Sequence, residues 1–292
     1  MIALRKNWWK ILILSLFATF IDILGHIIDG TVLPQLPLSI ISKTIGMRAT
    51  VIIYFIIWFS ILSLICLQTE KWLSGSKLIK GVKYGISFGV MMYFAACETN
   101  TIYGTPVIDD IRIAAVDSIA FIIFGVLGGK MFGTDSPDKQ QALTKMNLFP
   151  VLTITLFFII GRYFAYSILA IESGYTERPI LTFIWTLSMG LSFGIMYLLI
   201  GKNINDNPIK KAMIFGLLIV GAISLFGNLF FPFEYQSSFA VMIPDYIVGR
   251  SIVDMAFITL GVFLGESIIQ KYRNSIRGDC KDRIEMGLGV PK

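Results

Sequence analysis

The chain has few of the residues from which catalytic and metal sites are usually built. Its 292 residues include one histidine and three cysteines, and only 15% are charged, against about 25% in a soluble domain. Cys66, Cys97 and Cys280 form no C-x-x-C pair, which argues against a disulfide framework and a cysteine-rich zinc site. One histidine excludes bis-histidine haem ligation and makes any metal site carboxylate-based. We therefore predict no metal and no cofactor.

Motifs of several enzyme classes are also missing. The sequence contains no P-loop, no Rossmann glycine pattern and no H-E-x-x-H, which argues against ATPases, dehydrogenases and zincins. The pI near 9.1 does not indicate a nucleic-acid partner, because the basic residues gather at helix ends on one side. No nucleic-acid binding is predicted.

Long apolar runs dominate the sequence. Hydrophobic residues make up 55% of the chain, and they form runs of about 20 residues, the length that crosses a bilayer as a helix. The prediction is an all-α, polytopic membrane protein, not a globular enzyme. Its eight expected transmembrane helices lie at 9–29, 49–68, 80–97, 113–132, 148–170, 180–200, 211–231 and 248–269.

The lysines and arginines predict the orientation. Of the 25 basic residues, all but six fall at one set of helix ends. Because cytoplasmic loops carry the excess of lysine and arginine, both termini are expected in the cytoplasm and the protein in the cell membrane. An even number of spans independently requires both ends on one side.

Two stretches of the chain resemble each other, which predicts an internal duplication. Residues 112–128 and 250–265 each carry an arginine, an aspartate four or five residues later, and glycines at the far end. We expect two parallel four-helix membrane repeats, 1–133 and 148–270, related by an axis along the membrane normal. A cytoplasmic linker, 134–147, joins them, and a cytoplasmic tail, 271–292, follows.

A charged trio recurs near the outer side of each expected repeat. An acid ends the third helix, an arginine opens the fourth, and an aspartate lies deeper on the fourth. Each arginine is expected near an acid of its own trio, because an unpaired charge beside hydrocarbon is costly. The trios are either structural clamps or the lining of an outward-facing cavity. Their members are Glu98, Arg112 and Asp117, then Glu234, Arg250 and Asp254.

The first expected helix carries a second candidate site. Asp22, His26 and Asp29 lie four and three residues apart, so they share one helical face. This face is either a proton relay or cation site, in which His26 changes protonation, or a satisfied histidine–aspartate pair. The fifth helix carries Arg162 within the span instead, and an Arg162–Asp22 pair is predicted if the two helices meet.

The four-helix unit resembles the VanZ-like family of small bacterial membrane proteins. The resemblance rests on an acid ending the third helix, followed by an arginine, an aspartate and a glycine on the fourth. It implies a role in the cell envelope, linked to glycopeptide resistance or to lipid-linked substrates. The residues that carry it are Glu98, Arg112, Asp117 and Gly128, and again Glu234, Arg250, Asp254 and Gly265.

Three functions fit these patterns. A binding or transport protein with a charged site between the repeats fits the duplication and the buried charges. A membrane enzyme acting on a lipid or lipid-linked envelope substrate fits the duplicated carboxylates, and a structural subunit of a larger membrane complex fits the lack of a signature. Expected partners are membrane lipids, a small-molecule or lipid-linked ligand, and other membrane proteins. The patterns favour binding or transport and leave enzymatic activity open.

Overall fold

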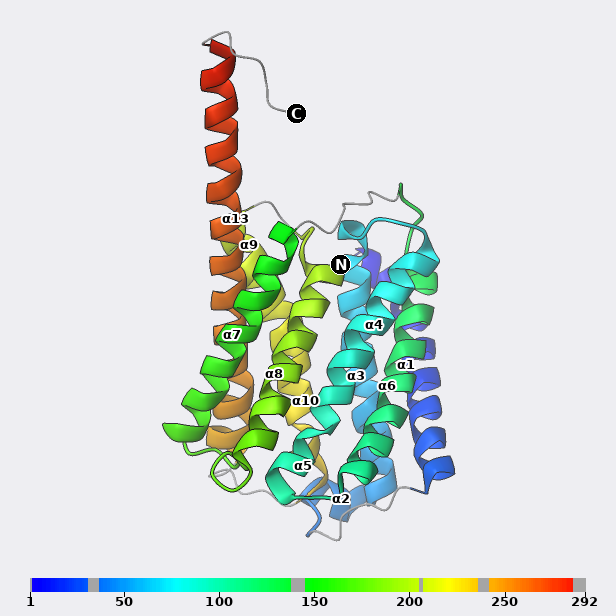
Figure 1. The fold of residues 1–292 in the computed structure, drawn as a ribbon. Coiled ribbons are helices and arrows are strands. Elements are labelled where there is room, and N and C mark those ends of the chain that lie inside the picture. Colours follow the sequence, from blue (N-terminus) through cyan, green and yellow to red (C-terminus); the bar gives the residue numbers. More distant parts are fainter. Residues whose placement is uncertain (1, 31–36, 138–144, 205–206, 236–241, 286–292) are drawn as a thin grey trace.

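The computed structural model describes residues 2–30, 37–137, 145–204, 207–235 and 242–285. In this part of the chain the structure is helical and contains no strand, only two isolated bridges. The long helices stand side by side in one bundle, and α1 begins at the end of the bundle from which α13 projects (Figure 1). The first half consists of α1 (Ile2–Asp29), α2 (Ile40–Ile45), α3 (Met47–Thr69), η1 (Glu70–Trp72), α4 (Lys77–Ala96), α5 (Glu98–Tyr103) and α6 (Val107–Phe132).

The second half contains several helices that continue one another. α8 runs into a π-helical turn, η2; α9, η3 and α10 form one continuous helix; and η4 leads directly into α13. The elements are α7 (Lys145–Ser167), α8 (Pro179–Met196), η2 (Tyr197–Gly201), α9 (Pro208–Ala212), η3 (Met213–Val220), α10 (Gly221–Asn228), α11 (Phe230–Glu234), η4 (Met242–Ile252) and α13 (Val253–Glu285).

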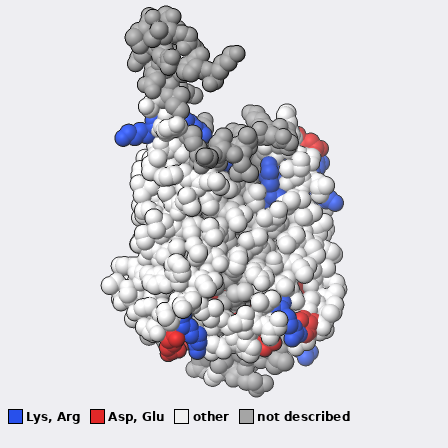
Figure 2. All heavy atoms as spheres, viewed as in Figure 1, with Lys and Arg blue, Asp and Glu red and all other residues white. Residues whose placement is uncertain are grey.

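The chain is a multi-pass, membrane-embedded helical protein. Seven helices of the described part are long and apolar enough to cross a bilayer, and α4 is not among these seven. Many large apolar side chains are exposed along them, for example Phe20, Ile119 and Leu218. On the face in Figure 2, charged side chains lie at the two ends and leave a wide band of other residues between them. Such a band matches the apolar core of a membrane.

Glycines allow α4 and α6 to pack at backbone distance. A Cβ added to Gly125 would lie 2.4 Å from the Cα of Gly85, and one added to Gly129 would lie 2.2 Å from the Cα of Gly81. Small residues at such a crossing let two helices approach more closely than larger side chains permit, and close packing drives association in lipid. This contact fixes the position of α6, which carries Asp117.

Some helix boundaries differ from those predicted. The fourth expected span begins at Val107 instead of 113, because Pro106 precedes the helix and two acids, Asp109 and Asp110, occupy its first turn, where they favour helix initiation. Helix α13 continues to Glu285 instead of ending at 269, because a helix already nucleated in the membrane propagates into polar sequence. Residues 138–144 of the predicted linker lie outside the described residues, as do 236–241 of the last loop predicted to be outside.

Candidate functional site

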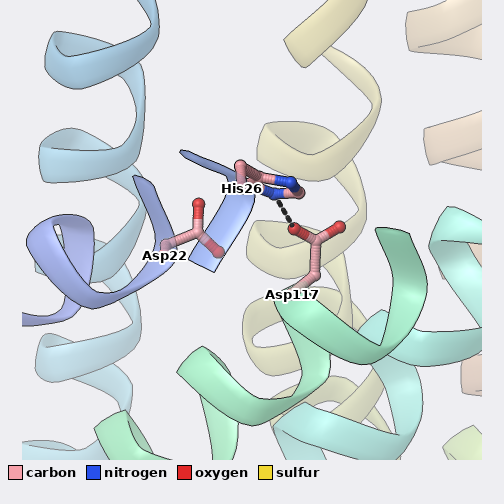
Figure 3. Close-up of side chains that lie close together, drawn as sticks. All are labelled: Asp22, His26 and Asp117. Atoms are coloured by element: carbon pink, nitrogen blue, oxygen red, sulfur yellow. Dashed lines mark hydrogen bonds and ion pairs between the residues drawn. The ribbon is translucent and has the colours of Figure 1, made fainter. Parts of the chain in front are cut away.

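Two groups of ionisable side chains are buried in the half of the bundle away from the start of α1. We call the first the histidine cluster; it consists of Asp22, His26 and Asp117. The imidazole Nε2 of His26 lies 2.7 Å from Oδ1 of Asp117, and the three residues each place one potential ligand atom within 4.8 Å of the others. Their side chains converge between α1 and α6 (Figure 3). This is the set in the described part of the chain whose donor atoms are spaced to hold a metal ion.

Helical spacing places these side chains together. Asp22 and His26 are four residues apart on α1 and therefore project from the same face. Asp22 lies seven residues before the end of α1, about 10 Å along the helix axis, and Asp117 lies ten residues after the start of α6, about 15 Å along it. The cluster is thus well below the helix ends, within the apolar zone.

Asp22 stands out among the buried groups. Its side chain is fully buried, and neither carboxylate oxygen has a hydrogen-bond partner in the described structure. Oδ1 of Asp117 accepts a hydrogen bond from Nε2 of His26 in the tautomer that carries the proton on Nε2. No lysine or arginine of the described residues forms an ion pair with either aspartate. Two carboxylates and one imidazole therefore share a buried site without a fixed positive charge.

Asp29 lies outside this cluster. Its carboxylate accepts hydrogen bonds from Arg112 Nε and Nη2, at 3.1 and 2.9 Å, and its carbonyl accepts another from Nη2 at 2.7 Å. The prediction that Arg112 lies near Asp117 or Glu98 is wrong, because five residues on a helix turn a side chain about 140° away from the first. Arg112 instead crosses to the end of α1.

We call the second group the arginine cluster; it consists of Glu98, Arg162, Asp245, Arg250 and Asp254. Oε1 of Glu98 accepts from Arg162 Nη1 at 3.1 Å and from Arg250 Nη1 at 2.7 Å. Arg162 Nη2 also donates to Asp254 at 2.7 Å, and Arg250 Nε donates to Asp245 at 2.9 Å. Both arginines are almost completely buried. Each guanidinium of this cluster is bound to two carboxylates, so every carboxylate in it has an arginine partner.

The arginine cluster corrects two predicted pairs. Arg250 was expected near Asp254 or Glu234, but it binds Asp245 and, across the bundle, Glu98. An Arg162–Asp22 pair was predicted if the first and fifth helices meet, but Arg162 binds Asp254 and Glu98, because α7 packs along α13. The guanidinium of Arg162 also lies 5.1 Å from the ring centre of Trp185 and 5.4 Å from that of Phe158, which adds a cation–π contribution.

Glu234 is a separate buried acid. It ends α11, its side chain is fully buried, and neither oxygen has a hydrogen-bond partner among the described residues. Its backbone carbonyl accepts a hydrogen bond from Ser39 N at 3.0 Å, which holds it against the first half of the chain. Burial raises the pKa of Glu234 from about 4.5 to about 8.

Two buried lysine–glutamate pairs were not predicted. Lys80 donates to Glu70 at 3.1 Å, and Lys211 donates to Glu266 at 2.7 Å. Glu266 also bonds to the hydroxyl of Tyr197. Both lysines entered the prediction only as indicators of orientation. Their position was a signal of burial. Lys80 and Lys211 each lie within the first turn of a helix, α4 and α9, and not in the loop before it.

Two G-x-S-x-G sequences lie at 85–89 and 190–194, but they do not form catalytic elbows. A nucleophile elbow places its serine on an exposed turn between a strand and a helix. Ser87 and Ser192 are instead buried within α4 and α8, and Ser192 donates to the carbonyl of Met189 at 2.7 Å. The chain's one histidine bonds to Asp117, so this pattern does not indicate a serine hydrolase.

Comparisons with protein-family models, with curated proteins and with solved structures give no match. The resemblance to the VanZ-like family therefore stays a prediction from the motif residues. What the helices establish is the class: an integral, multi-pass membrane protein in contact with lipid.

Proposed function

We propose that the protein binds and transports a cation across the cell membrane, using the histidine cluster as its binding site. The observation that carries this proposal is a difference between two matching aspartates. Asp254 forms an ion pair with Arg162, whereas Asp117 shares its site with Asp22 and His26 and has no ion pair to a lysine or arginine of the described residues. A membrane-buried carboxylate without a fixed counter-charge is characteristic of ion and proton pathways.

The comparison between these aspartates assumes the duplication, which several contacts support. Nη2 of Arg112 donates to the carbonyl of Asp29 at 2.7 Å, and Nη2 of Arg250 donates to the carbonyl of Glu172 at 2.7 Å. In each half, the arginine that opens the last helix therefore binds backbone at the outer end of the first. The halves are 1–133 and 148–270.

The two tryptophans of the second helices make a similar pair of contacts. Trp185 Nε1 donates to the carbonyl of Phe94, on the third long helix of the other half, at 2.7 Å. The ring of Trp58 lies 3.4 Å from a Cβ built on Gly227, which also belongs to the third long helix of the other half. Equivalent contacts in both directions are expected of two repeats related by a twofold axis along the membrane normal.

Helix α4 is proposed as the eighth span. It contains 20 residues, about 30 Å of helix, and packs along α6 through the glycine contacts described above. It connects the end of α3 to the start of α6, at opposite ends of the bundle (Figure 1). Eight crossings with the lysine-rich ends inside place both termini in the cytoplasm.

Glu98 is proposed as the contact between the halves that changes during transport. It belongs to the first half, and both of its arginine partners belong to the second. Alternating access moves one half against the other around a site near the membrane midplane. Such a motion has to lengthen or exchange the bonds of Glu98. The VanZ-like resemblance adds a cell-envelope setting to this proposal.

Flux into vesicles tests the proposed function. Purified protein is reconstituted into lipid vesicles, and the entry of protons, Na⁺ and Zn²⁺ is followed with enclosed indicator dyes under an imposed gradient. We expect faster entry of at least one of these cations than in protein-free vesicles. Asp117→Asn should abolish the increase. The matched control is Asp109→Asn, which changes a half-exposed acid on the same helix and should leave the flux unchanged.

Equal entry rates in vesicles with and without the protein would refute transport of these cations. Equal rates for the parent and Asp117→Asn would refute the assigned site. Co-purification in fixed stoichiometry with another membrane protein, together with no flux, would favour the alternative role as a subunit.

A further inference from the structure

We infer that the histidine cluster is a binding site for a divalent first-row transition-metal ion, with Zn²⁺ or Mn²⁺ as the fitting ions. The inference rests on the proposed function in one respect, since it names the class of cation that the site would carry. It stands on the geometry, burial and donor chemistry of Asp22, His26 and Asp117. It departs from the sequence analysis, which predicted no metal.

The donor atoms are already close to a coordination geometry. Atoms bound to one ion at about 2.1 Å are separated from each other by about 3.0–3.5 Å. The Nε2 of His26 and Oδ1 of Asp117 are 2.7 Å apart, and all three donor atoms lie within 4.8 Å of one another. Small side-chain rotations therefore bring them around one ion, while α1 and α6 keep their places.

Asp22 provides the observation that points to a ligand. A fully buried carboxylate with no hydrogen bond to either oxygen has a large desolvation penalty. Its side chain is directed toward His26 and Asp117 (Figure 3). In the second half, the buried carboxylate of Asp254 has the guanidinium of Arg162 as its counter-charge. In the deprotonated form that binds a metal, the two carboxylates and the imidazole of the histidine cluster would carry a charge of about −2, which a divalent ion balances.

The mixture of donors selects the kind of ion. Mg²⁺ and Ca²⁺ favour oxygen ligands and bind through carboxylates, carbonyls and water. An imidazole combined with carboxylates suits Zn²⁺ and the neighbouring transition metals. Three protein donors leave a fourth position for water, as in zinc sites that exchange a ligand. An open position is also what a transported ion needs in order to leave.

His26 is the most exposed member of the cluster. The side chain of His26 keeps 24% of its surface exposed, while that of Asp117 keeps 8% and Asp22 is fully buried. The alternative occupant of the cluster is a proton shared by the two carboxyl groups. Measuring metal binding distinguishes between these two occupants.

Equilibrium binding of Zn²⁺ to the purified full chain tests the inference independently of transport. The purification tag is removed, because histidine tags bind Zn²⁺, and a Cys97→Ser, Cys280→Ser background excludes these two thiols. Competition with a chromophoric Zn²⁺ indicator should give one site per chain. Asp22→Asn and Asp117→Asn should each weaken binding at least about tenfold, while Asp109→Asn should bind like the parent.

A second measurement needs no substitution at the site. The chain contains one histidine, so the ultraviolet absorbance of N-carbethoxyhistidine formed with diethyl pyrocarbonate reports on His26 alone. Saturating Zn²⁺ should slow this modification at least tenfold, and the same concentration of Mg²⁺ should leave the rate unchanged.

Two results would overturn the inference: the absence of stoichiometric Zn²⁺ and Mn²⁺ binding to the parent, or a carbethoxylation rate that Zn²⁺ does not alter. Either would leave a shared proton as the occupant of the cluster. Zn²⁺ binding at the site without flux in vesicles would support the metal site and refute the transport proposal, so the two failures are distinguishable.

Discussion

The carboxylate of Glu98, which begins α5, lies 2.7 Å from the guanidinium of Arg250, which is 152 residues further along the chain. The same oxygen accepts from Arg162 at 3.1 Å. One partly buried acid of the first half therefore joins two buried arginines of the second, near the end of the bundle where α5 lies. These bonds determine how the two halves meet at that end.

Replacement of Glu98 by alanine should strongly destabilise the protein. Removing one partner of a buried ion pair leaves uncompensated charge, which costs about 3–5 kcal/mol. We expect Glu98→Ala to lower the Tm of the purified protein, measured by tryptophan fluorescence, and its yield after extraction. The control is Glu177→Ala, since Glu177 is 71% exposed and lies 3.8 Å from Arg178, an arrangement worth less than about 1 kcal/mol. Equal Tm values for the two variants would contradict this role of Glu98.

The sequence predicted the helical class and most of the long helices, because a run of about 20 apolar residues has few other stable structures in lipid. It also predicted that Asp22 and His26 share a face, which depends only on helical periodicity. The contribution of Asp117 to the same cluster depends on the packing of α1 against α6, and nothing local to either helix determines that contact.

The partners of the arginines were not predictable from local spacing. Arg250 and Asp254 are four residues apart, which would allow a pair on one helix. In the structure Arg250 lies in the π-helical segment η4, whose wider turns change the direction of its side chains, and Arg162 on α7 binds Asp254. Glu98 reaches across to the other half, so its role depends on how the halves meet.

Gly125 should tolerate no side chain. A Cβ at this position would lie 2.2 Å from the backbone nitrogen of Gly85, so Gly125→Ala must push α4 away from α6. Overpacking of this kind costs about 1–3 kcal/mol. Gly128→Ala is a matched control on the same helix, because the nearest atom to its Cβ would be Cys66 Sγ at 3.5 Å. Thermal unfolding should show a lower Tm for Gly125→Ala alone. A Tm as high as that of Gly128→Ala would mean that α4 and α6 are less tightly packed.

Glu234 should make stability depend on pH. Burial raises its pKa to about 8 in the folded protein, whereas its usual value is about 4.5. Below pH 4.5 the group is protonated in both states and does not affect stability. Between pH 4.5 and 8 the unfolded chain releases this proton while the folded chain retains it, so stability falls as the pH rises. Above pH 8 the loss is complete.

Glu234→Gln removes this titration and keeps a similar shape. The difference in Tm between Glu234→Gln and the parent should grow from pH 5 to pH 8 in favour of the variant and then stay constant. At pH 9 we expect the variant to be more stable by up to about 5 kcal/mol, because a pKa raised from about 4.5 to about 8 corresponds to that cost of ionising the buried carboxyl group. Parallel Tm curves for the two proteins across this range would show that Glu234 does not titrate as described.

The Arg162–Asp254 pair offers a test by double substitution. Arg162→Met should cost about 3–5 kcal/mol, because Asp254 then carries a buried charge with no remaining ion pair in the described structure. Adding Asp254→Asn removes that charge, so the double variant should recover at least half of the loss. Glu98 still has Arg250 as a partner in both variants, which confines the coupling to the pair. Additive losses in Tm would mean that the two residues do not stabilise each other. Arg112→Met serves as the comparison, since Arg112 is 51% exposed and binds Asp29 near the end of α1, where loss of an ion pair costs less than about 1 kcal/mol.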